Sequence, residues 1–199
     1  AMPEQAGRRL GIDVSMTWLV VAKRLIAESG GEPVLAAALG EALPLREQEV
    51  DVVVSLDVIE HVNAPAQFLR EVDRVLKPGG RAVLTTPNRF SLTAEPHVQV
   101  WGVGWLPQPL QAPFVRWRSG KDYSDTRLMS SFALQRTIRA NTGMAFRFET
   151  PSVPIEEIAR FSRLKSALAK VYNAICNLPV LKPVFLLVGP FFRVVGQKS

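Results

Sequence analysis

The sequence predicts an α/β fold, specifically a doubly wound, Rossmann-like sheet of mostly parallel strands with helices on both faces. Two observations support this prediction. Short apolar runs alternate with segments of helical periodicity, and the connections between them are short. One of the runs, Asp51–Ser55, holds three successive valines and is apolar on both faces, as strands buried in parallel sheets are. The length of 199 residues suits one domain.

The elements succeed one another regularly over the first 86 residues. Ser15 is the expected N-cap of the first helix, which Ser29-Gly30-Gly31 ends. Lys77-Pro78-Gly79-Gly80 is expected to end the second helix. The predicted order is strand, helix, strand, strand, helix, strand, at residues 8–13, 16–27, 33–39, 51–55, 64–76 and 82–86.

The regular pattern fades after Pro87, where prolines are concentrated. Residues 90–128 hold three of the four tryptophans and show little periodicity, which predicts a lid or acceptor-binding insertion. The region 155–188 is predicted as a basic amphipathic extension of a single domain that spans 1–199. The elements expected after the insertion are a helix, a strand, a basic helix and a final strand, at residues 130–140, 145–150, 155–175 and 191–195.

The net charge of +6 is distributed unevenly. Residues 1–99 carry 10 Lys+Arg against 13 Asp+Glu, and residues 100–199 carry 14 against 5. A basic half suits an anionic substrate, a membrane surface or nucleic acid, or is a basic surface without a partner. The basic residues form no evident stripe and no nucleic-acid-binding motif is recognised, so nucleic acid is not expected.

Membrane contact is considered for the C-terminal region. Leu178–Val195 is the most apolar stretch, but it contains Lys182, Arg193 and three prolines, which argues against a spanning helix. Peripheral contact of this stretch and of the 155–175 helix with a membrane is one interpretation, and packing on the domain core is the other. The single cysteine, Cys176, excludes a disulfide framework. With no signal-peptide pattern at the start, a cytoplasmic location is expected.

Four motifs in a fixed order are more specific than the periodicity. They are Gly11-Ile12-Asp13-Val14-Ser15, Leu43-Pro44, Asp57–Val62 and Leu76–Gly80. In these motifs the chain resembles the class I S-adenosylmethionine-dependent methyltransferases, nearest to small-molecule and sugar O-methyltransferases of the ubiquinone-pathway type. The resemblance covers about residues 8–90. It implies methyl transfer from S-adenosylmethionine to a hydroxyl of a small-molecule or carbohydrate acceptor.

The resemblance also implies a cofactor site at the strand ends. An acidic residue there can accept both hydrogen bonds of a ribose diol, and Asp13 has this position, with Val14 beside it. The segment Leu39-Gly40-Glu41 would lie along the adenine. Many relatives have Asp where Leu39 stands, so a backbone group is expected to make that contact. Leu56 and Asp57 would face the methionine part and the acceptor.

A hydroxyl acceptor must lose its proton to a general base or beside a metal ion. The chain has two histidines, His61 and His97. Asp57, Glu60 and His61 are spaced i, i+3, i+4 and would share a face if the segment is helical. Some similar methyltransferases hold Mg²⁺ or a related ion on such a cluster. His97 could complete this cluster or serve as the base. The alternative is a capping Glu60 and a satisfied His61 without metal. Asp57, His61 and His97 are thus the candidate catalytic residues.

The insertion contributes further candidates. Its aromatic residues suit stacking on a sugar, and the basic residues nearby suit a carboxylate or phosphate. The alternative is that the tryptophans pack the lid on the core. These residues are Trp101, Trp105, Trp117 and Tyr123, with Arg89, Arg116, Arg118 and Lys121.

One expected motif is not found. A strand that runs into a Gly-x-Gly-x-Gly loop should precede Asp13, but Ala1–Gly7 contains one glycine. In this family that strand lies between the strands that end at Asp13 and Ser55. Either an upstream segment supplies it, or the chain is a non-catalytic binding or interaction protein with a degenerate methyltransferase fold. Direct pairing of 51–55 with 8–13 would exclude the first explanation. A nicotinamide-dependent dehydrogenase shares the strand-end acid but not the motif Leu76–Gly80. The oligomeric state is not predicted.

Overall fold

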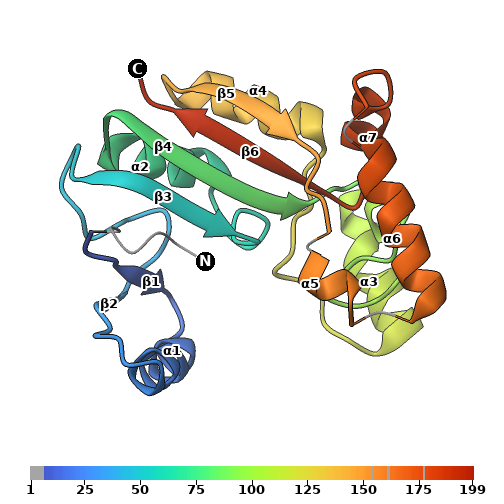
Figure 1. Ribbon diagram of the computed structural model, residues 1–199, viewed down its shortest axis with the longest axis horizontal. Coiled ribbons are helices and arrows are strands. Elements are labelled where there is room, and N and C mark those ends of the chain that lie inside the picture. Colours follow the sequence, from blue (N-terminus) through green and yellow to red (C-terminus); the bar gives the residue numbers. More distant parts are fainter. Residues whose placement is uncertain (1–6, 154, 161, 177) are drawn as a thin grey trace.

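The computed structural model describes residues 7–153, 155–160, 162–176 and 178–199 (Figure 1). The strands are β1 (Gly11–Asp13), β2 (Leu35–Ala37), β3 (Val50–Leu56), β4 (Leu76–Pro87), β5 (Ala145–Glu149) and β6 (Phe191–Gln197). The helices are α1 (Met16–Glu28), α2 (Pro65–Val75), α3 (Gln108–Ser119), α4 (Ser131–Asn141), α5 (Ile155–Ile158), α6 (Arg163–Cys176) and α7 (Lys182–Val188), with a short 3₁₀ turn, η1 (Val103–Trp105).

The strands form two separate sheets. The larger has the order β3-β4-β6-β5, in which β3 and β4 are parallel and β6 runs antiparallel to both of its neighbours. The smaller consists of the parallel pair β1 and β2, which lies with α1 below the larger sheet in Figure 1. Within the described residues β1 and β3 do not pair. Direct pairing of these two strands would have excluded an upstream strand between them, and it is not observed.

The main core lies between the larger sheet and the helices α2 and α4 on one of its faces. Pro65 opens α2 at a position where its missing N–H costs nothing, and apolar residues recur at helical spacing behind it. The buried set includes Phe68, Leu69, Val72, Leu84, Leu134, Ile138, Phe192 and Val194. Gly40 packs on this core so closely that a Cβ there would lie 2.8 Å from the Phe68 ring, so only glycine fits without movement of the ring.

The opposite face of β3 is less covered than the sequence predicts. Val53 packs on the core, whereas Val52, Val54 and Leu56 are each more than half exposed. The strand is an edge of its sheet, with β4 as its one strand neighbour. α1 is similar, because Leu19 is its one buried residue. The apolar run therefore identified a strand correctly but overestimated its burial.

Several elements differ from the prediction. The motif Lys77–Gly80 lies inside β4 rather than between two elements, with Gly79 at a φ of 76°. The predicted helix 155–175 is divided into α5 and α6, and α7 was not predicted. α3 lies in a segment expected to be irregular because of its prolines, one of which, Pro113, is inside the helix.

No helix among the described residues has both the length and the apolar character needed to cross a membrane.

The thiol of Cys176 is expected to resist modification in the folded protein. The residue is fully buried at the end of α6, and burial raises the pKa of its thiol, so little reactive thiolate forms at neutral pH. Titration with an aromatic disulfide reagent should give almost no reaction in buffer and one thiol per chain in guanidinium chloride. Rapid reaction in buffer would contradict the burial of Cys176 at the end of α6.

Candidate functional site

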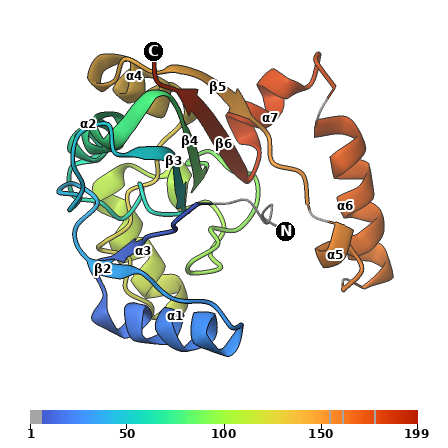
Figure 2. The ribbon, with the colours of Figure 1, turned by 60° about the vertical axis from the view of Figure 1, so that its left-hand side comes forward.

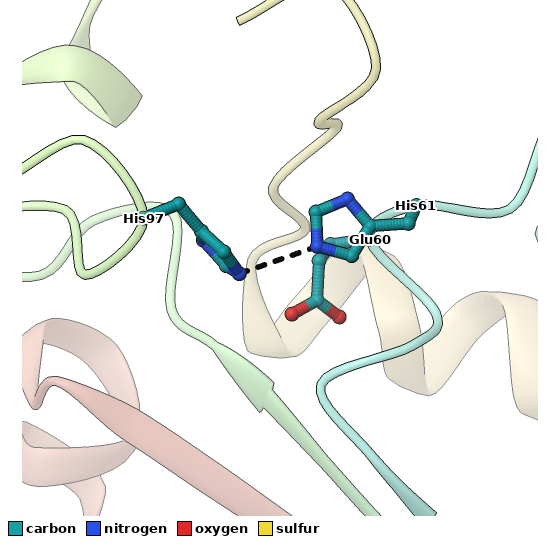
Figure 3. A group of neighbouring side chains, drawn as sticks. All are labelled: Glu60, His61 and His97. Atoms are coloured by element: carbon teal, nitrogen blue, oxygen red, sulfur yellow. Dashed lines mark hydrogen bonds between the residues drawn. The ribbon is translucent and has the colours of Figure 1, made fainter. Parts of the chain in front are cut away.

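Three side chains that can bind a metal ion meet beyond the carboxyl ends of β3 and β4. Glu60 and His61 follow β3, and His97 comes from the segment after β4 (Figure 3). One ligand atom of each residue lies within 4.8 Å of the others. The ends of parallel strands are the edge at which open α/β sheets bind ligands.

The hydrogen bonds fix both imidazole rings. Nδ1 of His61 lies 3.2 Å from the carbonyl oxygen of Asp125, and Nδ1 of His97 lies 2.6 Å from Oε1 of Glu95. Because a carbonyl or a carboxylate only accepts, each Nδ1 carries the proton. In the neutral rings each Nε2 then presents a lone pair, yet the two Nε2 atoms lie 3.2 Å apart. Two lone pairs repel at that distance, so the arrangement suits a shared proton or a cation.

Glu60 adds a buried carboxylate to this cluster. The residue is fully buried, Thr86 donates a hydrogen bond of 3.0 Å to its Oε2, and its Oε1 has no partner among the described residues. Burial raises the pKa of Glu60, because the charged form loses its hydration. A bound cation would compensate for both the lost hydration and the unpaired oxygen.

Asp57 is outside the cluster, although the spacing predicted it as a ligand. That prediction required a helix, but residues 57–62 form a turn in which the His61 N–H bonds to the Val58 carbonyl. Asp57 itself has a φ of 54°, and its Oδ1 accepts a hydrogen bond of 3.2 Å from the hydroxyl of Thr85. The structure therefore keeps Glu60 and His61 together and replaces Asp57 with His97 as their neighbour.

The predicted cofactor residues lie at the ends of the smaller sheet and of β3. Asp13 ends β1, where its Oδ1 accepts a hydrogen bond of 2.7 Å from the Ser15 N–H at the start of α1. Gly40 contacts Phe68, as described above. Val14, Leu39 and Leu56 are more than half exposed. Their role in cofactor binding stays a prediction.

The insertion, residues 90–128, has a small core of its own, made by Val98, Val100, Val103, Val115 and Tyr123. Arg89, interpreted as an anion-binding residue, instead donates to the carbonyls of Gly104 and Leu106. Trp101 and Trp105 bind backbone carbonyls through their indole N–H groups, and Trp117 is exposed. The insertion is thus a folded unit rather than an irregular loop.

Tyr123 brings a buried phenol close to the cluster. Its hydroxyl has no hydrogen-bond partner among the described residues. Burial and the negative charges of Glu95 and Glu60 raise the pKa of Tyr123, so the phenol stays protonated at neutral pH.

Two groups that orient the cluster, the Thr86 hydroxyl and the Asp125 carbonyl, were not predicted from the sequence. The position of Thr86 at the end of a strand was the one signal that could have identified that residue.

Residues 1–84 match the family model described as a methyltransferase domain. A probable S-adenosylmethionine-dependent methyltransferase of Mycolicibacterium smegmatis is 51% identical over 51 residues, which are 26% of this chain and 20% of that protein. The ubiquinone biosynthesis O-methyltransferase of Pseudomonas fluorescens is 36% identical over 93 residues, 45% of this chain and 39% of that protein. The matches therefore span less than half of the length of these curated relatives.

Solved structures show the same fold over almost the whole chain. The [4+2]-cyclase SpnF is similar with a TM-score of 0.57 at 18% identity, over 96% of this chain and 66% of that one. Phosphoethanolamine N-methyltransferase 2 of Haemonchus contortus, in complex with S-adenosylmethionine, has a TM-score of 0.59 at 15% identity, over 96% of this chain and 43% of that one. The predicted Rossmann-like α/β fold is confirmed.

Proposed function

We propose that this chain, which carries the class I S-adenosylmethionine-dependent methyltransferase fold, transfers a methyl group from that cofactor to a hydroxyl of a small molecule or carbohydrate. The observation that carries the proposal is the cluster of Glu60, His61 and His97 at the strand ends, on a chain that matches the methyltransferase domain. The cluster and the methyltransferase match are connected by the acceptor, because a hydroxyl acceptor needs a base or a metal ion.

A sulfonium is already an activated methyl donor, so the protein mainly has to align the acceptor atom with the methyl group. An amine acceptor attacks with its own lone pair once it is unprotonated. A hydroxyl is a weak nucleophile until its proton is removed. Glu60, His61 and His97 offer basic groups for that step, which is consistent with a hydroxyl acceptor.

The donor set of the cluster fits a divalent cation. Two imidazole nitrogens and one carboxylate suit Mn²⁺, Fe²⁺ or Zn²⁺ better than Mg²⁺, which prefers oxygen ligands. Such an ion lowers the pKa of an acceptor hydroxyl. Glu95 and the Asp125 carbonyl hold the rings with their Nε2 atoms directed at one another. The alternative role for His97, as a metal-free general base oriented by Glu95, predicts activity that a chelator does not change.

A second candidate is a non-catalytic binding or interaction protein. It is favoured by the apolar side chains that α1 and the outer face of β3 leave exposed, because such surfaces often contact partners. The fold does not decide the question, since a cyclase shares it.

Binding of S-adenosylmethionine tests the proposal. Asp13→Ala is expected to weaken binding at least about 10-fold, because each hydrogen bond to a charged group contributes about 1.5–3 kcal/mol. Calorimetry on both proteins measures the effect. Asp51→Ala is the matched control, since Asp51 is an exposed acid near the start of β3, away from Asp13 at the end of β1, and is paired with Lys77. If the unaltered chain gives no heat and no thermal shift with the cofactor, the second candidate stands instead.

A further inference from the structure

Helix α6 presents a row of apolar side chains to solvent. Leu164, Leu168 and Val171 are spaced i, i+4, i+7 and lie on one side of the helix, where they are 73%, 61% and 57% exposed. The buried residues of α6, Ala169 and Cys176, lie on the opposite side. Figure 2 shows that α6 stands at the edge of the molecule, away from the sheet. The sequence left open whether this helix packs on the domain core. The structure shows that the side chains of this row do not.

The orientation of α6 is fixed by bonds on its inner side. The Tyr172 hydroxyl donates to the Pro151 carbonyl, and the Asn173 side chain bonds both the N–H and the carbonyl of Val153 at 2.8 Å. Thr150 donates to the Cys176 carbonyl. The apolar row therefore faces outward because the other side of the helix is held against residues 150–153.

The charge on α6 and on the chain that follows it has one sign. From Ala159 to the last residue the sequence has seven Lys and Arg and no Asp or Glu. Three of them, Arg163, Lys165 and Lys170, are on α6 and exposed. An exposed apolar row with Lys and Arg beside it is typical of helices that lie in the plane of a membrane surface. α1 also exposes apolar residues, but it belongs to the half of the chain with a net negative charge.

We propose that α6 docks the protein on an anionic lipid surface. Leu164, Leu168 and Val171 enter the headgroup region, and the basic residues of α6 contact lipid phosphates. Each basic residue near such a surface contributes about 1 kcal/mol, and the contribution falls as salt rises. The helix, about 21 Å long at 1.5 Å per residue, lies along the surface and does not cross it.

Flotation of the full chain with vesicles tests this inference. We expect binding to phosphatidylcholine vesicles that contain phosphatidylglycerol, little binding to phosphatidylcholine alone, and release of the bound chain by added salt. The double variant Lys165→Glu, Lys170→Glu should reduce binding at least about 30-fold, from about 2 kcal/mol of lost attraction. The double variant Leu164→Glu, Leu168→Glu should reduce it similarly.

Phe132→Glu is the control, because Phe132 is an apolar residue of α4 that is 77% exposed, so its replacement adds a negative charge on the surface away from α6. It should leave binding unchanged, and thermal unfolding should confirm that all variants fold. Equal binding to neutral vesicles, or binding that survives the leucine changes, would overturn the inference. So would a dimer in solution that the leucine changes dissociate, since a second copy would then cover the row.

Discussion

Replacement of His97 by alanine is expected to abolish divalent-cation binding while the fold is retained. His97 contributes one of three ligand atoms of the cluster and is exposed, so its loss removes a donor without a packing defect. Loss of an outer partner alone costs about 10–100-fold in metal affinity, and loss of a ligand should cost more. Calorimetric titration with Zn²⁺ and Mn²⁺ after chelation measures the change, and methyl transfer to a hydroxyl acceptor should fall with it.

Two further variants separate the explanations. Glu95→Gln should weaken cation binding about 10–100-fold, because Glu95 orients His97 without contacting the ion. Asp57→Asn should change affinity much less than His97→Ala, since Asp57 lies outside the cluster and asparagine tolerates its positive φ. Binding that depends on Asp57 but not on His97 would support the ligand set expected from the sequence spacing and contradict the arrangement seen in the structure.

Replacement of Arg74 by alanine is expected to destabilise the protein by about 2 kcal/mol, equivalent to about 4–8 °C in Tm. Arg74 bonds both carboxylate oxygens of Glu71 at 2.7 and 2.8 Å and donates to the carbonyls of Leu43 and Leu45. Glu71 also accepts the Leu43 N–H. These bonds fasten the segment after β2 to α2. Thermal unfolding measures the loss, with Arg136→Ala, an exposed arginine of α4, as control.

The effect of Arg74→Ala should depend on pH. The hydrogen bond from Arg74 lowers the pKa of Glu71. A carboxyl whose pKa is lower in the folded state stabilises the fold above its unfolded pKa of about 4.3, and this contribution is lost as the pH falls through the folded pKa. The difference in Tm between the two proteins should therefore be full at neutral pH and shrink in acid. A constant difference would show that Arg74 acts by packing alone.

Much of the fold was predictable because local patterns determine it. The apolar spacing of Phe68, Leu69 and Val72 produced α2 within one residue at each end, and Ser15 caps α1 as its residue type suggests. α3 was not predictable, because Pro109 and Pro113 mask its pattern. The burial of β3 was overestimated since the valine run records which side chains are apolar and not what covers them.

The site was predictable in composition and not in geometry. Glu60 and His61 were identified together with Asp57 from their spacing, which assumed a helix where the chain turns. His97 lies 36 residues from His61, and no local pattern reports that their Nε2 atoms meet. Long-range partners such as the Asp125 carbonyl depend on how the insertion folds back, which periodicity does not encode.

The separation of β1 and β2 from the larger sheet has a consequence for how the molecule opens. The ladder that joins β1 to β2 shares no backbone hydrogen bond with β3, so it can break while the β3–β4 ladder stays intact. Amide protons of residues 11–37 then exchange with solvent through a local opening, whereas those of β4 and β6 exchange only through global unfolding. Asp13, the proposed ribose contact, lies in the part that opens first. A ligand bound to Asp13 would oppose this local opening, so the amide protons of residues 11–37 would exchange as slowly as those of β4 and β6.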